Sequence, residues 1–368
     1  MDKATYETNK YIKGPMHQSL RHDSAHKHVA GSAEYIDDIP EPAGLLHGAL
    51  GMADRAHADI LSIDLSAVKA HPGVICVLTA DDITGVNDVS SGGRHDEPLI
   101  ATDRIEFHGQ TIFAVIAETR DAARKAARLA KVEYRDLPFW TDILVTPGMT
   151  LKRGTPETEL DKAEHRLKSS MRIGGQEHFY LESHIALAIP GEDDEVAIWS
   201  STQHPSEIQH IVGHVLDIPS NAITVNTRRM GGGFGGKETQ GNQFAALAAL
   251  AAKKLKRAVK FRPDRDEDMG VTGKRHDFKM DFDVAFNDEG KIHAIEANFA
   301  ARCGYSSDLS GPVTDRALFH ADSSYFYPLV KLTSQPLKTH TVSNTAYRGF
   351  GGPQGMLGAE RVIEEIAY

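Results

Sequence analysis

The stretch MGGGFGGKETQ, Met230–Gln240, decides the fold and raises the question of what ligand it holds. The spacing of Gly231, Gly233 and Gly236 matches the G-x-G-x-x-G dinucleotide fingerprint. A phosphate-binding P-loop also fits as far as Lys237, but the next residue is a glutamate, where Mg²⁺ coordination needs Ser or Thr. Two nucleotide interpretations therefore compete for one segment, and its surroundings must decide between them.

The surroundings of this loop have the geometry of a nucleotide site but not its chemistry. The pattern predicts a strand over Ala222–Thr227 and a helix over Gln243–Arg257, as both motifs require. An acidic ribose ligand should follow a Rossmann fingerprint by about 20 residues. That region is instead the basic helix end KKLKRAVKFR, and the carboxylate of Glu238 would repel a phosphate. Both nucleotide interpretations are therefore disfavoured.

Five glycines occupy the six positions 231–236, interrupted only by Phe234. A tight turn for strand–helix packing needs one glycine, and each further glycine costs backbone entropy. The pattern therefore indicates a backbone that lies against a flat or bulky ligand and offers N–H groups to it. A second segment, NTAYRGFGGPQG over Asn344–Gly355, repeats this composition and adds an arginine that can reach an anionic group.

Composition limits the class of protein. The 368 residues suffice for two or three domains, and 40% hydrophobic with 25% charged residues is typical of a globular chain. A net charge of −10 argues against a nucleic-acid partner, which favours a basic face. Cys76 and Cys303 are too few for a disulfide framework or an Fe–S cluster. Segment 1–18 lacks a signal-peptide core, and no run approaches the about 18 apolar residues of a membrane helix. We therefore expect a cytoplasmic protein without a membrane partner.

The first third of the sequence alternates short apolar runs with amphipathic segments, which is typical of α/β (α+β) organisation. Thr119 is expected to cap a helix that runs to Lys131. Across Pro138–Pro156 the periodicity weakens and prolines accumulate, which predicts a domain boundary. The other expected strands are Ile60–Leu65, Val74–Thr79, Thr111–Ala117, Val132–Asp136, Ala186–Ile189 and Glu195–Ser200, and the other expected helices are Leu65–His71 and Ser206–Leu216.

Seven motifs, in order along nearly the whole chain, resemble the molybdenum-binding portion of the xanthine dehydrogenase family. They are GQEHFYLE (Gly175–Glu182), STQHP (Ser201–Pro205), RRMGGGFGGKE (Arg228–Glu238), DRDEDM (Asp264–Met269), TGKRHDF (Thr272–Phe278), DRALFH (Asp315–His320) and NTAYRGFGGPQG (Asn344–Gly355). The resemblance implies a hammerhead-like domain over residues 1–137, a linker over 138–160 and the first molybdopterin-binding domain over 161–368. This would be the first half of the molybdenum module.

The resemblance also implies that the glycine loop holds a molybdenum–molybdopterin cofactor rather than a nucleotide. Gln203 matches a glutamine that hydrogen-bonds an oxo ligand of the metal. Gly233, Phe234 and Gly235 match residues whose backbone lies over the metal, and Arg348 matches an arginine near the pterin. In this family the dithiolene of the cofactor holds the metal, which explains a site without protein thiolates.

The substrate that the resemblance implies is a purine. Glu238 and Arg316 match the pair that grips the polar edges of hypoxanthine or xanthine during oxidation to urate with oxygen from water, and Phe350 matches a ring that stacks on the purine. Taken singly, Glu238 could be a solvated carboxylate near a helix start, and Arg316 a surface ion pair with Asp315. Related aldehyde oxidases lack the pair, so its presence favours a purine substrate. The alternatives are an aldehyde oxidase or dehydrogenase, and a catalytically incomplete scaffold.

The remaining parts of the family's enzymes have no match in this sequence. Nothing after Phe350 corresponds to the domain that carries the general-base glutamate, so we expect a separate polypeptide to supply it; a truncated product would give the same sequence. Iron–sulfur cysteines and a flavin segment are also missing. By analogy, electrons would pass through Fe–S clusters and FAD in partner subunits to NAD, in a dimer of such heteromers.

Overall fold

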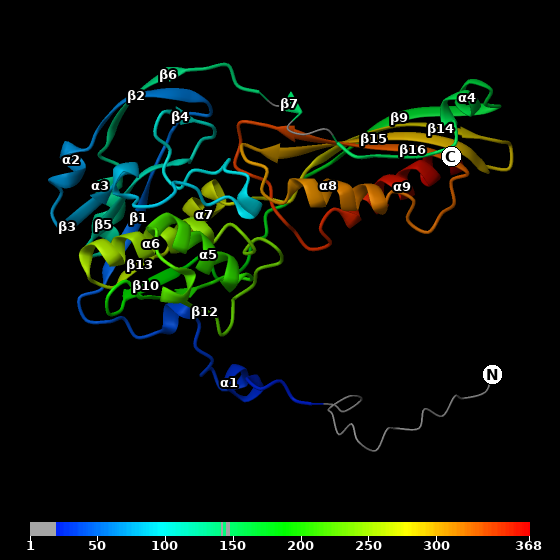
Figure 1. The fold of residues 1–368 in the computed structure, drawn as a ribbon. Helices are drawn as coiled ribbons and strands as arrows, with labels where there is room; N and C mark the ends of the chain where they lie inside the picture. The colour runs from blue at the N-terminus through cyan, green and yellow to red at the C-terminus, as the bar shows by residue number, and fades with distance from the viewer. Residues whose placement is uncertain (1–19, 141–142, 145–147) are drawn as a thin grey trace.

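The computed structural model describes residues 20–140, 143–144 and 148–368, and the expectation for segment 1–18 lies outside these residues. The chain forms a body of sheets and helices and, beside it, a second lobe built on one long sheet (Figure 1). This is the mixed α/β architecture that the sequence indicates. Among the described residues, no helix has the length and apolar character that crossing a membrane requires.

The body is built on a seven-stranded sheet that joins distant parts of the sequence. Strand β1 (Leu46–Met52) lies inside it, parallel to β13 (Val259–Phe261) on one side and antiparallel to β5 (Thr111–Ala117) on the other. The full order is β12-β11-β10-β13-β1-β5-β3, where β3 is Val74–Leu78, β10 Ala186–Pro190, β11 Val196–Ser200 and β12 Ile223–Asn226. The amino-terminal and central segments therefore share one sheet.

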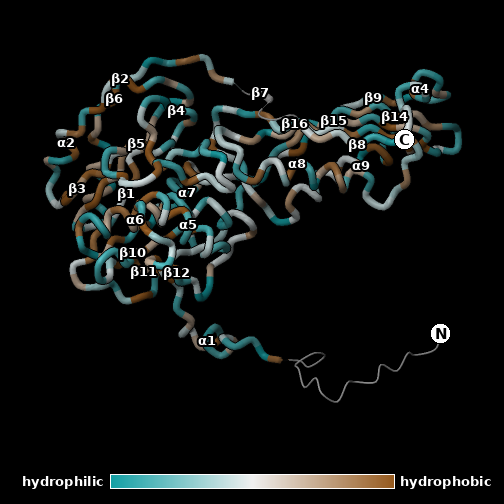
Figure 2. Tube along the Cα trace, in the orientation of Figure 1, coloured by the Kyte–Doolittle hydropathy of each residue, from teal (hydrophilic) through white to brown (hydrophobic). Residues whose placement is uncertain are grey.

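Strand β5 is buried on both faces, because helices cover the sheet from both sides. Ala114 and Ile116 belong to the core under α5 (Pro205–Leu216) and α6 (Asn242–Leu255), whereas Phe113 and Val115 belong to the core under α3 (Arg120–Ala127). Figure 2 shows hydrophobic stretches along β3 and around α6. An uninterrupted apolar run such as TIFAVIA is what burial on both faces requires.

A three-stranded sheet of β4 (Arg104–Ile105), β2 (Ala58–Asp64) and β6 (Lys131–Asp136) completes the body. Helix α3 begins as expected, with the Thr119 hydroxyl accepting a hydrogen bond from the backbone N–H of Ala122. Its expected end at Lys131 is wrong. The helix ends at Ala127, because Lys131 pairs with Asp64 as the first residue of β6.

The second lobe is a six-stranded sheet of β9 (His165–Ile173), β14 (Phe278–Phe286), β15 (Ile292–Gly304) and β16 (Leu329–Lys338), with β7 (Ile143–Leu144) and β8 (Thr150–Arg153) paired to β16. Helices α8 (Ser310–Phe319) and α9 (Gly352–Ala367) cover one face. Alternate β14 residues, Phe278, Met280, Phe282 and Val284, face these helices, and the residues between them are more exposed. The elements β7 and β8 lie within the range 138–160, expected to be a linker, and α4 (Pro156–Asp161) begins within it.

Short helices connect these elements. They are α1 (Ala25–Val29), α2 (Ser66–Lys69), α7 (Arg265–Val271) and the 3₁₀ turns η1 (Ile36–Asp38), η2 (Ala80–Asp82), η3 (Ser91–Gly93) and η4 (Ser220–Ala222). The glycine loop follows β12 and precedes α6, which confirms the expected strand, loop and helix. The second glycine-rich segment leads into α9. No helix or strand is predicted after residue 257, whereas the structure has the long strands β14, β15 and β16 of the second lobe there.

Candidate functional site

The glycine loop is fixed to the body by Gln203, which lies between β11 and α5. The Gln203 Oε1 atom accepts hydrogen bonds from the backbone N–H groups of Gly235 at 2.8 Å and Lys237 at 3.3 Å. The backbone N–H of Gln203 donates to the Lys237 carbonyl at 2.8 Å. A Cβ atom on Gly233 would lie 2.6 Å from Gln203 Oε1, so the loop closes onto this side chain only with glycine there. Among the residues that the structure describes, no hydrogen bond uses the Gln203 amide nitrogen Nε2, so this donor is available to a ligand.

The two glycine-rich segments form one site. The backbone N–H of Arg348 donates to the carbonyl of Phe234 at 2.8 Å. A Cβ atom on Gly235 would lie 2.7 Å from the Ala346 carbonyl oxygen, and Gly235 has a left-handed φ of +98°. The short distance to the Ala346 carbonyl and the positive φ each exclude a residue larger than glycine at position 235. The segments that the sequence presents as separate glycine-rich loops are therefore a single continuous wall.

A buried histidine supports this wall from the protein side. His178 Nε2 lies 2.7 Å from the carbonyl oxygen of Ala346, so this nitrogen must donate. A Cβ atom on Gly236 would lie 2.7 Å from the His178 ring. Burial lowers the pKa of His178 to about 4, which keeps the imidazole neutral near pH 7. A neutral ring with its proton on Nε2 satisfies the carbonyl without placing a charge in the core.

The exposed side of the wall carries groups that suit a flat, anionic ligand. Phe234 has a φ of +54° and a side chain that is 49% exposed, and Arg348 is exposed next to it in the wall. A hollow of about 750 Å³ lies beside the loop. Its lining includes Gly231, Gly232, Phe234, Phe179, Leu181 and Tyr35. Gln203 and Arg348 are outside the lining of this hollow and belong to the rest of the wall. An amide donor, a guanidinium and apolar surface on one wall are typical of an organic cofactor site.

Glu238 lies at the end of the loop, half-buried. Burial raises the pKa of its carboxyl, and nearby His204 opposes this shift. Helix α6 begins only at Asn242, so Glu238 lies outside the first helical turn. The next two residues contact other segments of the site. Thr239 Oγ1 lies 3.4 Å from Thr345 Oγ1 in the second glycine-rich segment, and Gln240 Nε2 donates at 3.4 Å to Asp308, which precedes α8.

Arg316 lies on α8 with an exposed side chain, and no ion pair with Asp315 is found in the part of the chain that the structure describes. Phe350 is half-buried against the core of α8 and α9, with a φ of +51°. A Cβ atom on Gly351 would lie 2.0 Å from the Val313 carbonyl, so the chain after Phe350 is pressed onto α8, less than one turn from Arg316. Within residues 20–140, 143–144 and 148–368, no hydrogen bond or ion pair joins Glu238 to Arg316, and the substrate roles of Glu238, Arg316 and Phe350 stay a prediction.

Two buried clusters near the loop were missed by sequence reasoning. In one, the Lys237 ammonium lies among Glu182 and Ser201. In the other, Asp96 accepts from the N–H and hydroxyl of Ser307 at 2.8 and 2.6 Å, close to Asp308. Lys237 could have been noticed from its place after the glycines. The acidic cluster joins residues more than two hundred positions apart, so no local pattern marks it.

Comparison with known proteins defines the class. Residues 142–368 match the molybdopterin cofactor-binding domain, and residues 30–138 match the a/b hammerhead domain of aldehyde oxidase and xanthine dehydrogenase. The fold is therefore that of a molybdopterin-binding module with a hammerhead domain. The chain belongs to the aldehyde oxidase and xanthine dehydrogenase family.

Relatives of this chain are much longer. Xanthine dehydrogenase from Emericella nidulans is 41% identical over 94% of this chain and 26% of its own length. Xanthine dehydrogenase/oxidase from Gallus gallus is 41% identical over 97% of this chain and 27% of its own length. The chain thus spans about a quarter of these relatives.

Solved structures show the same fold. Aldehyde oxidoreductase from Desulfovibrio gigas superposes with a TM-score of 0.83 at 25% identity, covering 94% of this chain and 41% of that one. CO dehydrogenase from Oligotropha carboxidovorans gives 0.82 at 25% identity, covering 95% and 48%. The hammerhead and molybdopterin-binding architecture expected from the sequence is confirmed.

Proposed function

We propose that this chain contributes to a molybdenum hydroxylase that oxidises hypoxanthine and xanthine to urate with oxygen from water. The observation that carries the proposal is that the Arg348 N–H bonds to the Phe234 carbonyl, which joins the two glycine-rich segments into one wall with the Gln203 amide beside it. The relatives at about 40% identity are named xanthine dehydrogenase, which supports a purine substrate.

Molybdopterin with its molybdenum fits this wall. The cofactor supplies the metal, its dithiolene ligands and the two-electron redox chemistry. Gln203 Nε2 would donate to an oxo ligand, the backbone at Gly233, Phe234 and Gly235 would cover the metal, and Arg348 would meet the anionic part of the pterin. The two cysteines of the chain are a half-buried Cys76 and a buried Cys303, so a metal held by the cofactor's own thiolates agrees with the donor set.

The substrate contacts proposed for this chain are Glu238, Arg316 and Phe350. Arg316 would donate to a purine carbonyl and stabilise negative charge as it develops on the ring. Glu238 would share a ring proton, and its raised pKa lets the carboxyl keep that proton at higher pH than an exposed glutamate. Phe350 would stack on the purine. None of these roles needs the three side chains to touch before substrate binds.

The rest of the enzyme would come from outside these residues. Because the chain spans about a quarter of its relatives, we propose that further polypeptide supplies the second molybdopterin-binding domain with the general-base glutamate. Fe–S clusters and FAD would carry electrons to NAD, within a dimer of heteromers.

A substrate panel tests this function. The complex isolated with this chain should contain molybdenum and should oxidise hypoxanthine and xanthine with a higher kcat/KM than aldehydes. A preference for aldehydes would instead favour the second candidate, aldehyde oxidation, which the likeness to Desulfovibrio gigas aldehyde oxidoreductase keeps open. A complex that carries molybdenum but oxidises neither class would contradict both.

A further inference from the structure

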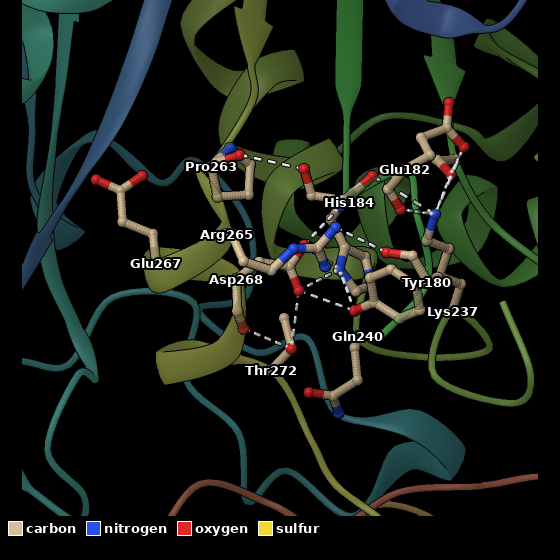
Figure 3. A network of polar contacts seen from close by, with 12 residues as sticks. Tyr180, Glu182, His184, Lys237, Gln240, Pro263, Arg265, Glu267, Asp268 and Thr272 are labelled. Carbon is tan, nitrogen blue, oxygen red and sulfur yellow. Dashed lines mark hydrogen bonds and ion pairs between the residues drawn. The ribbon is translucent and has the colours of Figure 1, made fainter. Parts of the chain in front are cut away.

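Lys237, the residue that made the loop resemble a P-loop, is fully buried at 0% exposure. Its ammonium donates to the Glu182 carbonyl at 2.7 Å and to the Ser201 hydroxyl at 2.7 Å, and it lies 3.5 Å from a Glu182 carboxylate oxygen (Figure 3). A buried ammonium is costly unless it is paired and hydrogen-bonded, and both conditions hold here. All three donors therefore point into the protein, and none can reach a phosphate.

Glu182 connects Lys237 to the other end of the loop. Its carboxylate oxygen Oε2 accepts from the backbone N–H of Gly231 at 2.9 Å and from the Ser201 hydroxyl at 2.6 Å, and its own N–H donates to the Gly231 carbonyl at 3.2 Å. A Cβ atom on Gly231 would lie 2.5 Å from the Glu182 Cβ. The first glycine of the loop and the residue after its last glycine are thus both attached to Glu182.

The residues packed against Lys237 are themselves hydrogen-bonded. The ammonium lies 4.5 Å from the centre of the Tyr180 ring, within the range of a cation–π contact. The Tyr180 hydroxyl donates to Asp268 at 2.8 Å, and the same carboxylate accepts from the His184 backbone N–H at 2.7 Å. Burial lowers the pKa of Lys237 to about 8, and the nearby Glu182 counters the shift, so the ammonium stays charged near pH 7.

We propose that Lys237 and Glu182 form a buried clasp that sets the distance between the two ends of the glycine loop and so fixes its shape before a ligand binds. They are positioning residues, because they act through the loop and do not touch its ligand. The identity of that ligand rests on the proposed function, but the clasp can be tested without the ligand. The Ser201 hydroxyl completes the clasp by accepting from Lys237 and donating to Glu182.

Hydrogen–deuterium exchange of the full-length, cofactor-free protein tests the clasp. In Lys237→Met, amides of residues 231–236 should exchange about tenfold faster than in wild type, while amides of α6 and β10 keep their protection. The matched control is Lys253→Met on α6, whose ammonium pairs at the surface with Asp194, and it should leave the loop unchanged. Equal acceleration across the whole protein, or none in the loop, would overturn the proposal.

A second pair of variants separates hydrogen bonding from packing. Glu182→Gln keeps an oxygen that can accept from Gly231 and Ser201 but removes the counter-charge of the Lys237 ammonium, so loop exchange should rise by less than in Lys237→Met. Glu182→Leu has a similar volume but no acceptor, and it should reproduce the Lys237→Met result. If Lys237→Met fails to fold, Ser201→Ala removes one link only and should accelerate the same segment. Molybdenum content, measured separately in the wild type, reports on the proposed function and not on the clasp.

Discussion

At the scale of single residues, Gln203 shows how one side chain can serve the fold and a ligand together. Its oxygen is used by the loop backbone, which fixes the rotamer of the amide, and its nitrogen is thereby aimed away from the loop. A donor held in this way loses little conformational entropy when a ligand arrives. Burying polar groups on the protein side and leaving a donor on the other side is what a preorganised site requires.

The first prediction at this scale concerns Arg316. Arg316→Met should lower kcat/KM for xanthine by about 10²- to 10³-fold, because a donor to the developing charge is lost, and should change aldehyde turnover much less. Steady-state kinetics on both substrate classes measures this. Arg361→Met on α9, where the arginine pairs with Glu365, is the control for removing an exposed arginine from a helix of the second lobe. Equal losses on purines and aldehydes would refute the assignment of Arg316 as a purine contact.

The second residue-scale prediction concerns Gly235. Gly235→Ala would force a Cβ atom toward the Ala346 carbonyl, at 2.7 Å, in a left-handed conformation. We expect a loss of about 1–3 kcal/mol in the free energy of unfolding and a large drop in bound molybdenum. Urea unfolding and metal analysis measure these.

Gly270→Ala is the matched control for Gly235→Ala. Gly270 lies in α7, has no atom within 4 Å of an added Cβ and has no positive φ. The alanine should be neutral or slightly stabilising there, because alanine favours a helix. If Gly235→Ala kept both wild-type stability and wild-type molybdenum, the close approach of the two loops would have no role.

At the scale of elements, the parallel pair β1 and β13 ties the hammerhead segment to the molybdopterin-binding segment. Gly48 pairs with Phe261, and a Cβ atom on Gly48 would lie 2.2 Å from the Phe261 ring. Gly48→Ala should therefore lower the free energy of unfolding by about 1–3 kcal/mol, because the ring or the strand must move. The test is urea unfolding beside the Gly270→Ala control. A wild-type midpoint would show that the ring can move at no cost.

The elements also show what the sequence could and could not reveal. The run TIFAVIA and the N-cap Thr119 are local signals, and both gave the right element. The alternation of buried and more exposed residues along β14 is an equally clear local signal for a strand. By contrast, the pairing of β1 with β13, some two hundred residues apart, depends on tertiary packing, and no local pattern specifies such a pairing.

The candidate site follows the same rule. Its glycine-rich segments stand out in the sequence because of their composition, but their contact through Arg348 and Phe234 does not. The second position of the clasp, Glu182, is an ordinary glutamate in sequence and becomes distinctive only when Lys237 is buried against it. The sequence therefore predicted the loops, and three-dimensional packing was needed to find what holds them.

At the scale of the whole molecule, a buried acidic cluster connects the hammerhead segment to the start of α8. Burial raises the pKa of Asp308 to about 6, with Glu238 adding to the shift, and burial together with Asp308 raises the pKa of Glu97. Because these two carboxyls hold protons in the folded state that the unfolded chain would release, their contribution to stability is complete below about pH 4 and is lost as pH rises toward 6.

Removing the Asp308 carboxylate should flatten this dependence. In Asp308→Asn, the fall in unfolding free energy between pH 4 and pH 6 should be smaller than in wild type by about 1–3 kcal/mol. Urea unfolding at both pH values measures the difference. Asp281→Asn, on the open face of β14, is the exposed control and should keep the wild-type slope. An Asp308→Asn slope equal to that of wild type would show that this carboxyl does not hold the proton.

The last prediction concerns the assembly that this chain enters. The wall of the site has an exposed side where Phe179 and Leu181 are 67% and 93% exposed beside the hollow at Gly231. Apolar residues this exposed beside a ligand site mark a surface that something covers. Native mass spectrometry of the protein from its own host should therefore show molybdopterin together with polypeptide mass well beyond the 40.2 kDa of these 368 residues.

The composition of that mass then separates the possibilities. A distinct partner polypeptide with Fe–S and flavin subunits supports a split molybdenum module, whereas one longer continuous polypeptide places the same domains in a single chain. In both cases a variant that separates the two glycine-rich segments, such as Gly235→Ala, should lose molybdenum. The reason is that the backbone contact between Arg348 and Phe234 builds this wall of the site. A solitary chain of 40.2 kDa without molybdenum would contradict the proposed enzyme, because a wall alone lacks the general base that purine oxidation needs.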